Sequence, residues 1–349
     1  MAVVSDLIPA DSDPPVITGR SAWIFSDGKA GHEAQCQGVV EALGLNAIVK
    51  RSNLSGIYKL MAPWGPLPAG ERMGKNGSAL GPPWPAFAFA TGRTTIPYIR
   101  ALRRHAGLQT YTVILMDPKT GPNSADLIWV PQHDSRRGPN VVTTLTAPHR
   151  FSPARLEALR ANIPAAIAAL PTPRIACLIG GPNGDYHYTD ADEERLVASL
   201  GALIDNGAGL MLTTSRRTPE RLAKRLQQTM AGKPAIFWNG DGPNPYPDFL
   251  AQADAFVITA DSVSMICEAA ATGRPIFLFS PTGGSPKFDR FHAALAAYGA
   301  TRALPAAGGP LSMWSYKPLH SADTIADEIR RRWLKRAAML PGLVNATRS

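Results

Sequence analysis

Short apolar runs that alternate with helical patterns are the feature that most limits how this chain can fold. The runs typical of buried strands lie at 22–26, 47–50, 86–90, 111–116, 127–130, 141–145, 174–179, 209–213, 235–238, 255–259 and 275–279. Apolar residues at helical spacing lie between them, at 33–43, 96–105, 153–170, 190–206 and 262–272, and a further helix is expected after Pro219. Because a parallel pair of strands needs a long crossover, this order predicts an α/β fold whose parallel sheets are covered by helices on both faces.

The length and the prolines divide the chain in two. At about 150 residues per domain, 349 residues predict two domains, and Pro171 and Pro173 mark the hinge. The expected parts are a tail at 1–19, a first domain at 20–170 with a Pro/Gly/Trp-rich insertion at about 54–85, a second domain at 171–320, and a basic helix and tail at 321–349. We expect two Rossmann-like, doubly wound domains that face a cleft.

Composition argues against several classes of protein. Apolar residues make up 45% and charged residues 18%, which suffices for a core and disfavours disorder. No stretch approaches the roughly 18 apolar residues of a membrane span, and the N-terminal residues lack the apolar centre of a secretory signal. Cys36, Cys177 and Cys267 lie far apart in sequence. We therefore expect no disulfide scaffold, no metal site and a cytoplasmic location.

The net charge of +9 favours anionic partners. Nucleic acid is disfavoured, because the basic clusters are short and lack interleaved aromatic residues. The insertion holds Trp64 and Trp84, with basic residues at Lys59, Arg72 and Lys75. One interpretation is a peripheral contact with the anionic inner face of the plasma membrane, and the alternative is an ordered surface flap or a disordered loop. The amphipathic, basic stretch at 325–340 is a second candidate membrane contact.

Polar turns follow most of the expected strands, and ligands of parallel sheets bind beyond the carboxyl ends of strands. The turn DGKAGH leads from a strand into a helix, and Gly28 and Gly31 permit close backbone approach to an anion. His32 is a candidate general base because imidazole titrates near neutral pH. Asp117, at the end of another strand, is the second, and Asp27 completes the catalytic candidates. One alternative is that the glycines only allow a tight, well-packed turn. Another is that His32 caps the helix or faces solvent.

Further strand-end residues of the first half are expected at the same cleft. They are Gly28, Lys29, Gly31, Thr91, Gly92, Arg93, Lys119, His133 and Asp134.

In the second half, the turn TADSVS lies between a strand and an apolar helix. Its hydroxyls and free N–H groups suit a diphosphate. Glu268 lies four residues after Ser264 on the same helix, so both can face the cleft. An unpaired carboxylate in an apolar helix is costly, and a ribose diol is a suitable partner for it. The alternative is that Asp261 or Ser262 only caps the helix.

Ser215, Arg216 and Arg217 follow another strand. Guanidinium groups match phosphate geometry and can neutralise a diphosphate leaving group without a metal ion. The alternative is a solvated helix start with surface arginines. The other candidates for binding a nucleotide sugar are Gly181, Asn183, Asn239 and Tyr246.

The motifs DGKAGHEAQ, TGRTT, DPK, PQHD, TAPHR, GGPN, TTSRRTP, NPY and ITADSVSMICEA follow one another in this order. In this, the chain resembles the bacterial branch of the "elongated mitochondria" (mitochondrial fission) family over about residues 20–320. Plant members of that family are associated with recruiting a dynamin-related protein to mitochondria.

The second half also resembles GT-B glycosyltransferases, especially the peptidoglycan N-acetylglucosaminyltransferase. That resemblance implies that Ser262, Ser264 and Met265 line the diphosphate and sugar and that Glu268 binds ribose. It also implies that His32 faces the acceptor, although DGKAGH replaces that enzyme's triple-glycine turn.

Residues and resemblance together lead us to expect a metal-independent GT-B-like glycosyltransferase. Its donor would be a nucleotide-diphosphate sugar, it would need no cofactor, and its acceptor would be a lipid-linked or envelope glycan. One alternative is a non-catalytic adaptor of the same shape. Another is a sugar-nucleotide epimerase, although the sequence lacks the dinucleotide fingerprint and YxxxK pair of an NAD-dependent one.

Overall fold

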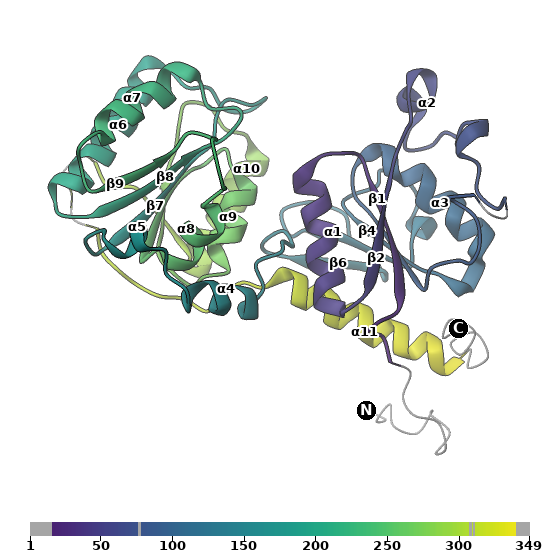
Figure 1. Ribbon diagram of the computed structural model, residues 1–349. Helices are drawn as coiled ribbons and strands as arrows, with labels where there is room; N and C mark the ends of the chain where they lie inside the picture. The colour runs from purple at the N-terminus through teal and green to yellow at the C-terminus, as the bar shows by residue number, and fades with distance from the viewer. Residues whose placement is uncertain (1–15, 76–77, 307–308, 310, 340–349) are drawn as a thin grey trace. The chain divides into compact units, whose positions relative to one another are not determined.

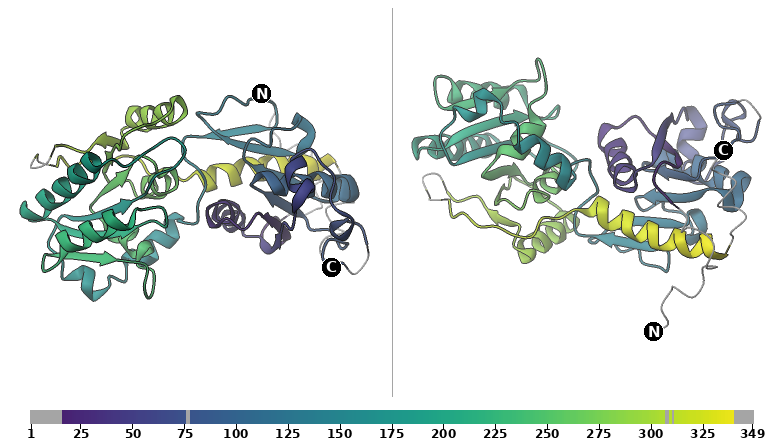
Figure 2. Two further views of the ribbon diagram at one scale, coloured as in Figure 1. Left: turned by 90° about the horizontal axis from the view of Figure 1, so that it is seen from above. Right: turned by 60° about the horizontal axis from the view of Figure 1, so that its bottom comes forward.

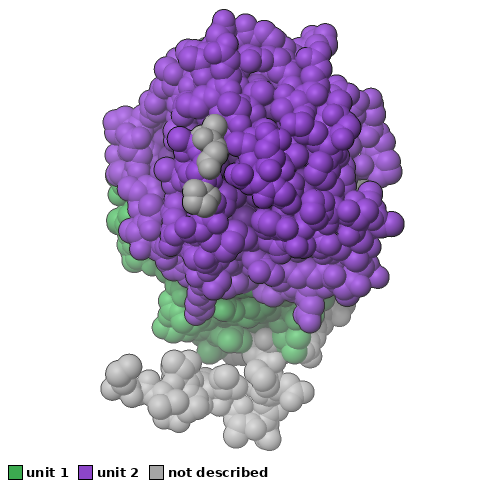
Figure 3. Space-filling model, turned by 90° about the vertical axis from the view of Figure 1, so that its left-hand side faces the viewer, with its two compact units in different colours: residues 1–150, 321–349 green, residues 151–320 purple. Residues whose placement is uncertain are grey.

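The computed structural model describes residues 16–75, 78–306, 309 and 311–339. The chain forms two compact units (Figures 1 and 3). Unit 1 comprises residues 1–150 and 321–349, and unit 2 comprises residues 151–320.

Unit 1 is built on a six-stranded parallel sheet in the order β2-β1-β3-β4-β5-β6. The strands are β1 (Ser21–Ser26), β2 (Asn46–Arg51), β3 (Phe87–Ala90), β4 (Tyr111–Leu115), β5 (Leu127–Pro131) and β6 (Val141–Thr144). All six lie where the apolar runs predicted strands. Ile24 packs with α1 (Ala30–Leu43), whereas its neighbours Trp23 and Phe25 pack with α3 (Ile96–Ala106). Alternate residues of a strand thus supply the cores on opposite faces of the sheet.

The last described helix, α11 (Ser321–Met339), belongs to unit 1, where it lies beside α1 (Figure 2). Its buried face includes Ile325, Ile329 and Trp333. The Trp333 ring lies 5.8 Å from that of Phe87, and the Arg20 guanidinium lies 4.9 Å from the Trp333 ring. Most of the apolar face of the stretch expected at 325–340 is therefore used in the core, and Leu334 and Met339 remain exposed. The rest of the expected tail, 340–349, lies outside the described residues.

The insertion contains α2 (Gly56–Met61) and a 3-10 turn, η2 (Ala69–Glu71). Its two tryptophans differ. Trp84 packs against Trp23 and His105, with ring centroids 6.1 and 6.3 Å apart, whereas 61% of Trp64 is exposed. Trp84 therefore anchors the insertion to the core, and of the pair only Trp64 is a surface residue.

Unit 2 repeats the architecture with the strand order β12-β11-β10-β7-β8-β9, again parallel throughout. The strands are β7 (Arg174–Ile179), β8 (Gly209–Thr214), β9 (Ala235–Trp238), β10 (Ala255–Thr259), β11 (Ile276–Phe279) and β12 (Thr301–Ala303). The helices are α4 (Pro153–Arg160), α5 (Ala165–Ala168), α6 (Asp190–Asp205), α7 (Glu220–Met230), α8 (Tyr246–Gln252), α9 (Val263–Ala270) and α10 (Pro286–Tyr298). Of these elements, α8, α10 and β12 were not predicted.

Two expectations near the hinge were wrong. The helix expected over 153–170 is interrupted before Pro164, because a residue that precedes proline is driven out of the helical region. The boundary between the units lies at 150/151 and not at 170/171. Segment 151–170 belongs to unit 2 because α4 packs on α8 there, and the Gln252 amide donates to the carbonyl of Leu159 at 2.9 Å.

In each sheet the strand order reverses once, between β1 and β3 in unit 1 and between β7 and β10 in unit 2. The crossovers leave in opposite directions at such a point, which opens space beyond the carboxyl ends of the strands. No helix in the described part of the chain is long and apolar enough to span a membrane.

Candidate functional site

The loops after β7 and β10 are held together by Asp261. Its carboxylate, whose side chain is fully buried, accepts hydrogen bonds from the Gly181 N–H at 3.0 Å and the Tyr188 hydroxyl at 2.7 Å. It also pairs with Arg217 at 3.0 Å. A Cβ at Gly180 would lie 2.2 Å from Asp261 Oδ2, so only glycine fits there. Asp261 is therefore a structural residue of this loop, and it does not line the space beside it.

Beside this loop lies a crevice of about 590 Å³ within unit 2. Its walls come from the ends of β8 and β9, the start of α8 and the first two turns of α9. The lining residues are Thr213, Thr214, Ser215, Arg216, Arg217, Trp238, Asn244, Tyr246, Ser262, Ser264, Met265 and Glu268. The structure thus brings together most of the residues expected to bind a nucleotide sugar, from four separate segments of the chain.

Glu268 is the only acidic residue in that lining. The Tyr246 hydroxyl donates a hydrogen bond to its Oε2. Burial raises the pKa of Glu268 to about 7, against the opposing effects of the Tyr246 hydrogen bond and the charge of Arg155. The same burial, together with the nearby carboxylate, raises the pKa of Tyr246. The crevice therefore offers a poorly solvated carboxyl group that titrates near neutral pH.

The two arginines of the crevice differ. Arg217 is committed to the loop, because it pairs with Asp261 and donates to the Gly181 carbonyl at 2.9 Å. Arg216 is exposed and has no ion pair or hydrogen bond among the described residues. It is the cation of this crevice that is available to an anionic ligand.

Among the described residues, the side-chain hydroxyls of Ser262 and Ser264 at the start of α9 make no hydrogen bond. Ser262 occupies the position before the helix, but its side chain makes no capping hydrogen bond, and Ser264 lies in the first turn. The first N–H groups of a helix lack partners within the helix, and its dipole favours an anion there. The serines and these N–H groups suit phosphate oxygens.

Thr213, Thr214 and Asn244 line the crevice although they were not among the expected site residues. The fourth such residue is Trp238. It ends β9 and is half-buried, and its indole N–H donates to the Asp241 carbonyl at 2.8 Å. A signal was present, because an aromatic residue at the carboxyl end of a parallel strand lies at the ligand-binding edge of the sheet. Its ring gives the crevice an apolar wall.

Four residues expected to contact the nucleotide sugar are not in the lining: Gly181, Asn183, Asn239 and Asp261. Asn183 accepts hydrogen bonds from the N–H groups of Asp185 and Tyr186, and Asn239 is bonded to Asp241. Asparagine side chains commonly close turns in this way, so these two residues shape their loops.

At the β1–β3 reversal in unit 1, Asp27 and His32 form a pair. His32 Nδ1 lies 3.1 and 3.0 Å from the two carboxylate oxygens of Asp27, which is largely buried. Gly92, at the end of β3, has φ +97°, and a Cβ there would lie 2.5 Å from Asp27 Oδ2. A carboxylate on Nδ1 holds the neutral ring in the tautomer whose Nε2 can accept a proton.

Asp117 is a poorer candidate base. It pairs with Lys119 at 2.8 Å and with Arg136 at 2.9 Å. Although burial works in the other direction, the hydrogen bonds from Lys119 and the charge of Arg136 hold the pKa of Asp117 below its usual value. This geometry favours His32 over Asp117.

The other strand-end residues of unit 1 have mixed surroundings. Gly28 has a positive φ, whereas Gly31 lies inside α1 and does not. Thr91 is buried, and its hydroxyl donates a hydrogen bond to the Leu115 carbonyl. Arg93 turns away toward the carbonyls of Ala62 and Leu60. Lys29 lies near Asp27, Lys119 pairs with Asp117, and His133 and Asp134 are half-buried in the turn after β5.

Within the described ranges, no group of three or more His, Cys, Asp or Glu residues is placed to hold a metal ion.

Sequence comparison finds related proteins. A family model described as Mitochondrial fission ELM1 matches residues 30–333. The mitochondrial fission protein ELM1 of Arabidopsis thaliana is 30% identical over 271 residues, which cover 71% of this chain and 64% of that protein. An uncharacterised protein of Rickettsia prowazekii is 31% identical over 160 residues, 44% of this chain and 45% of that protein. The chain thus spans less than two thirds of the length of either relative.

Solved structures with a similar fold are more distant. MurG of Acinetobacter baumannii is 13% identical over 94% of both chains, with a TM-score of 0.46. The S. aureus MnaA–UDP structure is 11% identical over 91% of both chains, with a TM-score of 0.49. The UDP-GlcNAc 2-epimerase of Methanocaldococcus jannaschii is 10% identical over 89% of this chain and 99% of that one, with a TM-score of 0.48.

Proposed function

The chain belongs to the Mitochondrial fission ELM1 family, and we propose that it binds a nucleoside-diphosphate sugar in the crevice of unit 2 and transfers the sugar without a metal ion. The observation that carries this proposal is the lining of that crevice. One poorly solvated carboxyl group, one uncommitted guanidinium and two uncommitted serine hydroxyls converge there beside a tryptophan ring.

Each of these groups suits one part of the proposed donor. Glu268 would accept hydrogen bonds from the ribose diol, and Tyr246 would give up its bond to Glu268 or share it. Arg216, Ser262 and the first N–H groups of α9 would bind the diphosphate. Trp238 would pack against the base or the ribose.

Transfer also needs a base, and the Asp27–His32 pair is our candidate. The acceptor hydroxyl oxygen would bond to the anomeric carbon as the bond from that carbon to the diphosphate oxygen breaks. The hydroxyl proton would pass to a general base, and the nucleoside diphosphate would leave with the electron pair. Arg216 would stabilise its charge in place of a metal ion. For the acceptor we propose a lipid-linked or envelope glycan, supported by the exposed apolar residues of α2.

A second candidate function comes from the family. The Arabidopsis relative is named for mitochondrial fission, which favours an adaptor that keeps this fold to bind a protein. An adaptor of this kind needs neither an uncommitted Arg216 nor a carboxyl group in the crevice.

Calorimetry and thermal shift with UDP-, GDP-, CMP- and dTDP-linked sugars distinguish the transferase from the adaptor. We expect one nucleotide class to bind, and Glu268→Ala to weaken that binding by at least about tenfold, because a hydrogen bond to a charged group contributes about 1.5–3 kcal/mol. Glu194→Gln, an exposed residue of α6, serves as the control and should bind as the parent does. A flat response to every sugar would favour the adaptor.

A further inference from the structure

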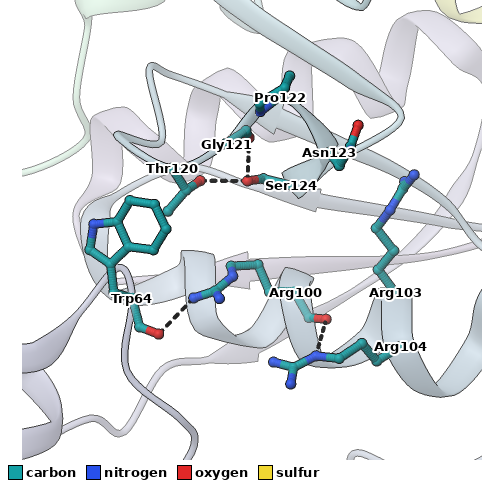
Figure 4. A pocket seen from close by; sticks show the side chains of 9 residues that line it. All are labelled: Trp64, Arg100, Arg103, Arg104, Thr120, Gly121, Pro122, Asn123 and Ser124. Carbon is teal, nitrogen blue, oxygen red and sulfur yellow. Dashed lines mark hydrogen bonds between the residues drawn. The ribbon is translucent and has the colours of Figure 1, made fainter.

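A second pocket, of about 480 Å³, lies in unit 1, and none of its lining residues belongs to the crevice of unit 2. Three arginines of α3 form one wall, Trp64 another, and the loop 120–124 the third (Figure 4). Apart from the arginines, the lining is made of Thr120, Gly121, Pro122, Asn123 and Ser124. It therefore combines positive charge with small polar groups and an aromatic ring.

The charge of this pocket is only partly compensated. Arg103 is paired with Asp126 at 2.5 Å. Arg100 donates to the carbonyls of Pro63 at 2.9 Å and Trp64 at 2.8 Å, and Arg104 donates to the Arg100 carbonyl at 3.3 Å. Among the described residues, neither Arg100 nor Arg104 has an acidic partner. Burial and the charge of Arg104 lower the pKa of Arg100, as expected for cations that share a site.

Exposed apolar side chains precede Trp64, which lines this pocket, in the chain. Ile57 is 65% exposed, Leu60 75% and Met61 43%, all on α2, and Trp64 follows three residues later at 61%. We call these four residues the apolar tip. Exposed apolar side chains are ordinary one at a time, but a cluster beside a basic pocket is typical of a binding surface.

The apolar tip is fixed to the pocket. Arg93 donates to the carbonyls of Ala62 and Leu60, and Arg100 to those of Pro63 and Trp64. The guanidinium of Arg100 also lies 5.7 Å from the Trp64 ring. The same arginine therefore lines the pocket and orients the tip, so a single ligand can contact both.

We propose that this surface docks on an anionic phospholipid bilayer. A lipid phosphate would enter the pocket between Arg100 and Arg104, and the apolar tip would sit among the acyl chains at the interface. The pairing of charge with adjacent exposed apolar residues is what favours a lipid over a soluble phosphate, which would leave the tip in water. This inference does not depend on the nucleotide crevice, because it uses other residues in the other unit.

Flotation of the full chain with vesicles tests the proposal. We compare vesicles of phosphatidylcholine alone with vesicles in which about one third of the lipid is phosphatidylglycerol. The Arg100→Gln/Arg104→Gln variant should bind the anionic vesicles about thirtyfold less tightly, since each basic residue at such a surface contributes about fivefold, or about 1 kcal/mol. Leu60→Ser with Ile57→Ser should weaken binding by at least about tenfold through lost apolar contact.

The matched control is Lys224→Gln/Lys233→Gln, which removes the same charge from unit 2 and should bind vesicles as the parent does. All variants should keep the parent's unfolding temperature and its response to nucleotide sugars, so that a failure here is separate from a failure of the proposed transferase. Equal binding by Arg100→Gln/Arg104→Gln and by the control Lys224→Gln/Lys233→Gln would overturn the proposal. So would saturable binding of glycerol phosphate at the arginines without vesicle binding, or a requirement for an acidic protein instead of lipid.

Discussion

Among the individual side chains, Glu268 and Tyr246 are the pair that gives the crevice its chemistry. The carboxyl group of Glu268 lies on an apolar helix. Among the described residues, its one hydrogen-bond partner is the hydroxyl of Tyr246. Such a group is expensive to keep for stability alone, because its charged form is poorly solvated. A ligand that supplies further hydrogen-bond donors would relieve this cost, which is why we place the ribose there.

The raised pKa of Glu268 gives a pH-dependence with a definite sign. The pKa of Glu268 is about 7 in the folded protein and about 4.5 in the unfolded chain. Between these values the folded protein binds a proton that the unfolded chain has lost, so the free energy of unfolding falls as pH rises. Relative to Glu268→Gln, the parent should lose on the order of 3 kcal/mol of stability between pH 4.5 and pH 7.

Denaturant unfolding of the parent, Glu268→Gln and the control Glu194→Gln across that pH range measures this difference. Using the difference between variants cancels the opposite contributions of Asp192 and Glu328, whose pKa values are lowered. Parallel curves for the parent and Glu268→Gln would show that the carboxyl group titrates normally.

Residue types at strand ends predicted much of the crevice. Ser264 and Glu268 were expected there because they lie four residues apart on the helix after β10, and Ser262 because its hydroxyl suits a diphosphate; all three line the crevice. The role of Asp261 was not predictable, because its hydrogen-bond donors are distant in sequence. They are the N–H of Gly181, the hydroxyl of Tyr188 and the guanidinium of Arg217. A strand-end aspartate has the same appearance in a sequence whether it binds a ligand or holds two loops.

The secondary-structure elements were predictable where the apolar pattern was long. Helix α8 was not predicted, because it is short and two prolines, Pro245 and Pro247, lie at its start. Proline is tolerated in the first turn of a helix, where its missing N–H has no partner to lose, so Pro247 is compatible with helix and the buried Phe249 and Leu250 follow it. This matters for the site, since α8 carries Tyr246.

Helix α11 offers a test of how unit 1 is completed. Trp333 is 6% exposed and packs against Phe87, so Trp333→Ala should leave a cavity and lower the free energy of unfolding by about 3–5 kcal/mol. Leu334→Ala, on the same helix but 38% exposed, should cost much less. Denaturant unfolding of both variants checks this, and equal effects would mean that α11 is only loosely attached to unit 1.

Considered as one chain, the protein is two parallel-sheet units, each with one reversal of strand order, and the alternation of strands and helices predicted this organisation. The proline pair misplaced the boundary, because α4 and α5 are held by packing on unit 2 that local sequence does not reveal. The reversal in unit 2 adjoins the crevice, and the central claim is that a nucleotide sugar binds there.

Hydrogen–deuterium exchange, measured with and without each sugar nucleotide of the panel, tests that claim most directly. We expect one nucleotide class to slow exchange at the backbone amides of 213–217, 244–246 and 262–268, the segments that line the crevice, and to leave the amides around Arg100 and Arg104 unchanged. Slowing confined to unit 1, or none with any sugar nucleotide, would contradict it.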